Sequence, residues 1–120
     1  MFTCDVRPDF YSWAEPVASK EHKCCECLAP ILKGETYFRA VGKWEGVVST
    51  HRQHLLCMEA CMLVRDKLND FECIPFGTLQ EWYGTYRHDF FNGRHPDEFL
   101  ELVRMIVKIR RRTREAKVVL

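Results

Sequence analysis

The sequence predicts a small α+β domain that is held together by a metal ion. Cysteines gather in two groups about 30 residues apart, β-forming residues lie between the groups, and a long amphipathic segment follows. The chain of 120 residues suits one domain over 1–120 with a modest core. A core of this size gains much from a bound metal.

The composition predicts a folded cytoplasmic protein. Apolar residues make up 47% of the chain and aromatic residues 12%, which argues against disorder. The net charge of +1 argues against binding nucleic acid through overall charge alone. No apolar run approaches the ~20 residues that span a bilayer, and residues 1–10 lack the pattern of a signal peptide. In a reducing compartment the seven cysteines favour metal ligation over disulfides.

Two cysteine pairs are predicted to bind one structural zinc ion. Cys24 and Cys27 form a C-x-x-C pair, whose tight turn directs both sulfurs at one ion while backbone amides donate to the thiolates. Cys57 and Cys61 lie four residues apart, on one face at the start of a predicted helix. Four protein ligands close a tetrahedral shell, so the expected zinc is structural and not catalytic.

The identity of the fourth ligand stays open between two residues. Cys61 is preferred because helical spacing places it on the same face as Cys57. His54 is the alternative, since its spacing from Cys57 also suits a zinc site and gives a Cys3His set without Cys61. Three further cysteines are not expected to bind the ion: Cys25 is a neighbour of the site, and Cys4 and Cys73 have a packing role.

The elements around these ligands can be predicted in chain order. Residues 1–23 form an irregular lead-in with two prolines, and its aromatics fold back onto the domain. Residues 24–71 form the zinc module. Within it, residues 35–41 are rich in β-formers, and the two glycines of 42–46 suit a hairpin connection. Residues 57–71 carry an apolar stripe at helical spacing. A knuckle, a hairpin and a helix in this order are typical of a treble-clef zinc site.

The remaining residues are predicted to form two more helices. Residues 72–95 form a connector with a short helix after Pro75, and residues 96–117 form a basic amphipathic helix. Acidic residues crowd the start of this helix and arginines its end, as the helix dipole favours. Such a helix is roughly 30 Å long. Basic side chains occupy the face opposite its apolar stripe: Arg104, Lys108 and Arg111.

Three motifs carry a resemblance to a known family. They read K-E-H-K-C-C-E-C-L-A-P-I-L-K-G-E-T-Y, then G-K-W-E-G, then C-M-E-A-C-M-L-V-R-D. Over about residues 21–84 the chain resembles a family of small cysteine-rich proteins encoded in bacteriophage genomes. The family's usual second pair is C-x-x-C, whereas this chain has C-x-x-x-C after a longer segment. The resemblance implies a zinc fold, a phage origin and a place in the host cytoplasm; it implies no activity.

Catalysis is not expected from this sequence. Treble-clef nucleases carry a histidine base near the positions of His51 and His54, but they also need an Asn and a His on the following helix. The helix here reads C-M-L-V-R-D-K-L instead. Nothing orients Ser49 or Thr50 as a nucleophile beside His51. The protein is therefore predicted to act by binding.

The expected partner is a host protein, such as a nuclease or a defence complex, that the protein inhibits or redirects. The alternative is nucleic acid, bound through the basic C-terminal helix. The residues predicted to contact a partner are Arg104, Lys108, Arg111 and, at the hairpin tip, Trp44.

Overall fold

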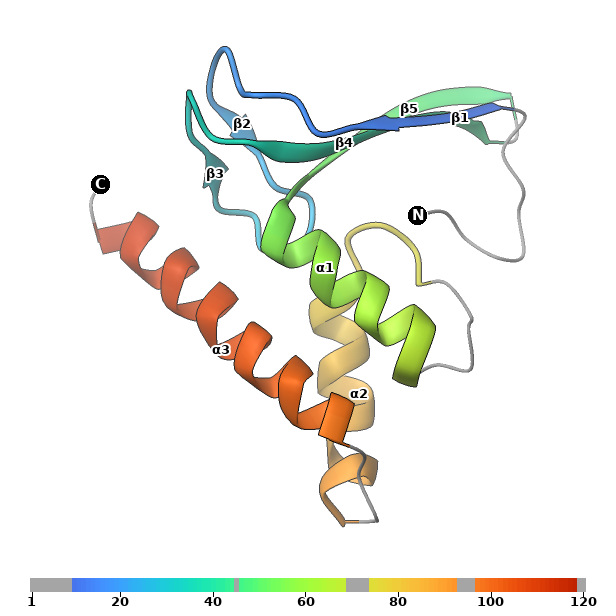
Figure 1. The fold of residues 1–120 in the computed structure, drawn as a ribbon, viewed down its shortest axis with the longest axis vertical. Coiled ribbons are helices and arrows are strands. Elements are labelled where there is room, and N and C mark those ends of the chain that lie inside the picture. The colour runs from blue at the N-terminus through green and yellow to red at the C-terminus, as the bar shows by residue number, and fades with distance from the viewer. Residues whose placement is uncertain (1–9, 45, 69–73, 93–96, 119–120) are drawn as a thin grey trace.

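The computed structural model describes residues 10–44, 46–68, 74–92 and 97–118, which form an α+β fold. A three-stranded sheet lies above the helices, and a two-stranded hairpin stands beside it (Figure 1). Within these residues no helix is both long enough and apolar enough to cross a membrane. In chain order the elements are β1 Phe10–Ala14, β2 His22–Lys23, β3 Pro30–Ile31, β4 Tyr37–Trp44, β5 Val47–His54, α1 Leu55–Leu63, the π-helical turn η1 Val64–Leu68, α2 Leu79–Asn92 and α3 Asp97–Val118.

The three-stranded sheet is antiparallel, with β4 between β1 and β5. Ala40 of β4 pairs with Trp13 of β1 and with His51 of β5. Because side chains alternate along a strand, Phe38 and Ala40 are buried on the helical side, while Arg39 between them points the other way. The sheet therefore has an inner face toward α1 and an outer face.

Strand β1 differs from the irregular lead-in that the sequence predicts over residues 1–23. Residues 10–14 pair along their whole length with residues 39–43. The run F-Y-S-W-A is short, and its partner lies about 30 residues further along the chain. Local pattern alone does not reveal such a pairing, because an edge strand gains its stability from the neighbouring strand.

The hairpin between β4 and β5 is confirmed, but its turn is tighter than predicted. The two strands pair from Tyr37 opposite His54 to Trp44 opposite Val47. Gly42 is thus a strand residue, and only residues 45–46 connect the strands. Gly46 adopts a φ of +81°, which glycine accepts without strain.

The helices follow the predicted order with different lengths. Helix α1 begins at Leu55, two residues earlier than predicted, because the chain passes directly from β5 into the helix. Helix α2 has 14 residues and is not short. Helix α3, Asp97–Val118, agrees with the prediction of 96–117 to within one residue at each described end.

The core lies where the apolar stripe of α3 meets the other helices. The stripe of α3 contributes four fully buried side chains to the core: Phe99, Leu102, Ile106 and Ile109. The ring of Phe99 stacks on Phe90 of α2, with 4.6 Å between centroids. Arg110 adds a cation–π contact over Tyr83, 5.4 Å from the ring centroid. The stripe therefore packs against an aromatic ring of α2 at Phe90, while the side chain of Phe91 lies outside the described residues.

Candidate metal centre

Four side chains with metal-binding atoms converge at one point inside the protein. They are Cys24, Cys27, His54 and Cys57, and all four are buried. Their ligand atoms all lie within 4.8 Å of one another. None of the five cysteines that the structure describes forms a disulfide. This buried Cys3His group, called the metal cluster below, is compatible with binding a metal ion.

The turn between β2 and β3 supplies two of the sulfurs. Its ends are joined by a hydrogen bond from Cys24 N to Ala29 O of 3.0 Å, and Leu28 N donates to Cys24 O at 3.0 Å. Leu28 adopts a φ of +63°, an uncommon conformation for a residue with a side chain. The left-handed residue reverses the chain directly after Cys27, which keeps both sulfurs on one side of the turn.

His54 lies at the junction of β5 and α1, and hydrogen bonds orient its ring. The Nε2 atom lies 3.0 Å from the carbonyl oxygen of Pro30, so Nε2–H donates to that oxygen. The Nδ1 atom lies 3.3 Å from Cys27 Sγ and faces the metal cluster. A carbonyl that accepts from one ring nitrogen leaves the other nitrogen available as a metal ligand. The backbone N–H of His54 also donates to Cys24 Sγ at 3.4 Å.

Cys57 is the third residue of α1. The first turn of a helix carries unpaired N–H groups and a partial positive charge, which stabilise a thiolate. Because α1 begins directly after His54, the strand end and the first helical turn together supply two donors within four residues. Helix α3 adds an interaction, since Thr113 acts to lower the pKa of the Cys27 thiol.

The side chains of the metal cluster affect one another's pKa values. Hydrogen bonds with Cys24 and then with Cys57 hold the pKa of the Cys27 thiol well below its usual range. Hydrogen bonding to Cys24 and Cys27 raises the pKa of Cys57. Burial, the largest single cause, acts to lower the pKa of His54, but the interactions with Cys24 and with the Pro30 carbonyl together raise it. A cation that replaces the thiol protons leaves the sulfurs ionised as ligands.

Cys61 does not join the metal cluster, which differs from the sequence-based preference for the fourth ligand. The structure brings His54 to that place instead. Residues four apart share a helix face, but they are separated by about 6 Å along the axis, so Cys61 lies one turn beyond Cys57. Its sulfur accepts a hydrogen bond of 3.7 Å from Gln53 Nε2. Burial, the largest cause, raises the pKa of Cys61 well above that of a free thiol.

A second buried polar group adjoins the metal cluster and centres on Glu26. The carboxylate accepts hydrogen bonds from Gln53 Nε2 at 2.8 Å, Gly77 N at 2.6 Å and Leu79 N at 3.1 Å. It thereby caps the start of α2 from a residue 53 positions away in sequence. The Cys25 thiol donates to the same carboxylate at 3.5 Å. We call Cys25, Glu26, Gln53 and Cys61 the carboxylate cluster.

Sequence reasoning missed Glu26, although it stands between the two knuckle cysteines. A glutamate in a turn is normally exposed, and no local signal marks one that is 5% exposed. Its main-chain partners come from 77–79, far along the chain. A sequence feature related to this contact is the glycine at position 77. Gly77 adopts a φ of +84°, and its N–H donates to the carboxylate of Glu26.

The predicted partner-binding residues lie apart from both clusters. Arg104, Lys108 and Arg111 are exposed on α3. The backbone of Trp44 pairs with Val47 beside the hairpin turn, while its side chain lies outside the described part of the structure. His51 is half-buried and stacks on Phe76, with 4.1 Å between ring centroids. Cys4 and Cys73 also lie outside the described residues.

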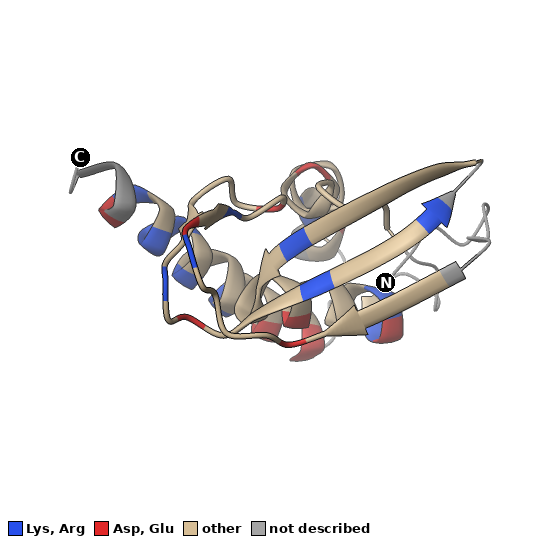
Figure 2. Cartoon of the chain, turned by 90° about the horizontal axis from the view of Figure 1, so that it is seen from above, with Lys and Arg blue, Asp and Glu red and all other residues tan. Residues whose placement is uncertain are grey.

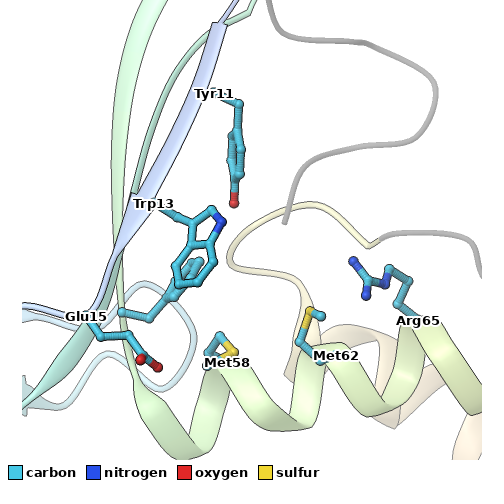
Figure 3. A pocket seen from close by; sticks show the side chains of 7 residues that line it. Tyr11, Trp13, Glu15, Met58, Met62 and Arg65 are labelled. Carbon is cyan, nitrogen blue, oxygen red and sulfur yellow. The ribbon is translucent and has the colours of Figure 1, made fainter.

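An apolar groove separates the inner face of the sheet from α1. It encloses about 310 Å³ and is shown in Figure 3. Trp13 forms one wall and is 61% exposed although it stacks on Phe38. Met58 and Met62 of α1 form the opposite wall. The full lining consists of Tyr11, Trp13, Glu15, Phe38, Met58, Met62 and Arg65.

Comparison of the chain with family models, curated proteins and solved structures finds no match in any of the three. The assignment of the site therefore rests on the geometry of the residues themselves.

Proposed function

We propose that the metal cluster binds one structural zinc ion. The single observation that carries this proposal is the convergence of Cys24, Cys27, His54 and Cys57 within 4.8 Å in a buried position. Three thiolates and one imidazole are a common structural zinc set, and tetrahedral zinc places its ligand atoms about 3.8 Å apart. Oxygen-preferring ions such as magnesium and calcium do not suit this donor set.

The order of the elements supports the interpretation of the site as a treble-clef zinc site. The β2–β3 turn supplies the first donor pair, the β4–β5 hairpin follows, and the start of α1 supplies the last donor. His54 takes the role of the third ligand at the hairpin's end. This arrangement joins a knuckle, a hairpin and a helix through one ion, and the ion's binding free energy then stabilises all three.

The protein in this proposal acts by binding and has no enzymatic activity of its own. Four protein ligands leave no open coordination position for a substrate or an activated water. We propose a host protein as the partner, with the exposed side chains Arg104, Lys108 and Arg111 as contacts. The groove with the exposed Trp13 and two half-buried methionines supports this choice, since tryptophan and methionine are frequent at protein interfaces.

Nucleic acid is the second candidate partner for the basic face of α3. The observation that favours it is the exposure of three cations on one helix face, without an ion pair to any of them among the described residues. A helix with such a face can follow a phosphate backbone, and the resulting affinity falls steeply with salt.

Elemental analysis of the purified protein tests the zinc proposal. We expect about one zinc per chain, and loss of that zinc in Cys27→Ser. Cys25→Ser is the matched control, because it removes a neighbouring thiol from the same turn but outside the metal cluster, and it should keep the metal. Protein without zinc, or equal loss in both variants, would overturn the proposal.

Affinity capture from host lysate tests the partner proposal. We expect a specific host protein to bind the wild-type chain and to be lost when Arg104, Lys108 and Arg111 are changed together to Glu. A gel-shift series at rising salt tests nucleic acid in parallel. A salt-sensitive shift with no captured protein would replace the first candidate by the second.

A further inference from the structure

The charged residues of the three-stranded sheet are all basic. Strands β1, β4 and β5 contain Arg39, Lys43 and Arg52 and no aspartate or glutamate. Figure 2 shows these strands from above, with Lys and Arg on β4 and β5. The strand register places Arg39 directly opposite Arg52. The next pairs along the same face are Val41 opposite Thr50 and Lys43 opposite Val48.

These six residues are the part of the outer face that β4 and β5 supply, on the side away from the groove with α1; Ser12 and Ala14 of β1 lie beside them. On the inner face the alternate residues Phe38, Ala40 and Gln53 are buried. Phe38 contributes to the groove with Met58 and Met62 of α1, which fixes the inner side. The alternate residues between 39 and 43 and between 48 and 52 therefore face outward, whereas Tyr37 and His54, at the end of the sheet next to β2, are buried. We call Arg39, Val41, Lys43, Val48, Thr50 and Arg52 the outer sheet face.

The arrangement of these cations is unfavourable unless an anion accompanies them. Like charges directly opposite each other on neighbouring strands destabilise the pair. The ion pairs among the described residues are Arg65–Asp66 and Arg112–Glu35, and neither involves the outer sheet face. The Nε atom of Arg52 is buried and has no hydrogen-bond partner within the described structure. A buried guanidinium N–H of this kind is a donor that lacks an acceptor.

Further positive charge lies beside the arginine pair. Partial desolvation, followed by the charges of Arg52, Lys20 and Arg39, lowers the pKa of His22. The three cations therefore lie close to one ring, at the end of the sheet next to the β2–β3 hairpin. The acid of the neighbouring β3–β4 turn, Glu35, is already engaged with Leu32 N and Arg112.

We propose that the outer sheet face binds the phosphate backbone of duplex nucleic acid. Two guanidinium groups side by side suit phosphate oxygens, because each guanidinium can donate two parallel hydrogen bonds. Lys43 lies four residues from Arg39, about 13 Å along the strand, and extends the face to further phosphates. The contacts are to phosphates and read no base sequence.

The composition of the outer sheet face favours this partner over two others. Protein interfaces rely on aromatic anchors, and the face offers Val41, Val48 and Thr50 instead. Proteins that bind single strands stack bases on aromatic rings, and none of the six residues is aromatic; Phe10 of β1, which pairs with Lys43, has its side chain outside the described residues. A duplex needs neither, because its bases are already stacked and its phosphates are exposed. The inference adds a second surface to the proposed binding function, and it does not depend on which metal is bound.

Fluorescence anisotropy with a labelled 20-base-pair DNA duplex tests the inference over a salt series. We expect the variant Arg39→Gln with Arg52→Gln to lose affinity on the order of tenfold or more at low salt. The slope of log affinity against log salt should fall by about 0.9 for each lost phosphate contact. The matched control, Lys67→Gln with Arg87→Gln, makes the same charge change at two exposed residues of η1 and α2, and it should bind like the wild type.

Several outcomes would overturn the inference. Equal losses in the double variant and in the control would show an effect of net charge alone. If the double variant binds the duplex as well as the wild type while the variant of Arg104, Lys108 and Arg111 loses binding, that result would place the duplex-binding surface on α3. Competition by polyglutamate as strong as by duplex DNA would indicate an acidic protein, and tighter binding of the single strand would exclude the duplex. Zinc content and circular dichroism report folding; if the double variant does not fold, Lys43→Gln alone must still reduce the slope.

Discussion

The metal cluster and the carboxylate cluster draw on the same three parts of the chain. The turn between β2 and β3 supplies Cys24 and Cys27 to the metal cluster, and Cys25 and Glu26 to the carboxylate cluster. The end of β5 gives His54 to the first and Gln53 to the second, and α1 gives Cys57 and Cys61 respectively. Neighbouring residues in sequence thus point into two different buried sites.

The two clusters satisfy buried polar groups in opposite ways. In the metal cluster three sulfurs and one imidazole nitrogen face one another, an arrangement compatible with a cation between them. In the carboxylate cluster one anion is surrounded by amide donors, and hydrogen bonds are sufficient. Cysteine count alone therefore does not define a metal site; the geometry decides which thiols become ligands and which pack as small apolar groups.

Removing the metal should have the largest effect of any change to either cluster. We expect a strong chelator to unfold residues 24–68 cooperatively, because the binding free energy of a structural zinc is folding free energy, on the order of 10 kcal/mol. Circular dichroism and thermal melting measure the change, and added zinc should reverse it. A spectrum and melting curve unaffected by metal removal would contradict a structural role.

Substitutions of His54 and Cys61, one from each cluster, test which of the two is the fourth ligand. We expect His54→Ala to weaken zinc binding by roughly a hundredfold or more, since it removes a ligand from a closed shell. Cys61→Ser should keep full zinc, because its sulfur bonds Gln53 and not the metal cluster. Competition with a chromophoric chelator measures both affinities. The reverse ranking would restore Cys61 as the ligand.

The carboxylate cluster should tolerate substitution at a moderate cost and without loss of metal. Glu26→Gln leaves at least one of its buried N–H donors without an acceptor, which costs about 1–3 kcal/mol of stability. Denaturant titration of the zinc-loaded protein measures this. Glu59→Gln, an exposed residue on α1, is the matched control and should leave the midpoint unchanged. Loss of zinc in Glu26→Gln would show that the two clusters are not separable.

The smallest effect on stability is expected far from both clusters. Arg104, Lys108 and Arg111 are exposed on α3, so their joint change to Glu should cost within about 0.5 kcal/mol each. Thermal melting at matched zinc content tests this. An unfolded triple variant would mean that the face is buried against another part of the protein.

The sequence predicted what depends on local spacing. Three of the four donors, the helical nature of residues 57–68 and nearly the full extent of α3 follow from motif and periodicity. The place of His54 could not be predicted without knowing where α1 begins. The helix begins at Leu55, and this start brings the preceding residue, His54, to the metal cluster. Strand β1 and the buried carboxylate of Glu26 arise from pairings between distant segments, which no local pattern specifies.

The contacts of α3 with the knuckle imply an order of folding. All four donors of the metal cluster lie between residues 24 and 57, so they meet after closure of a loop of about 30 residues. Thr113 and Arg112 reach Cys27 and Glu35 only across a much longer stretch of chain. Contacts of long sequence separation form late. We therefore expect the knuckle, the hairpin and α1 to capture the ion first, and α3 to dock afterwards onto a structure that is already assembled.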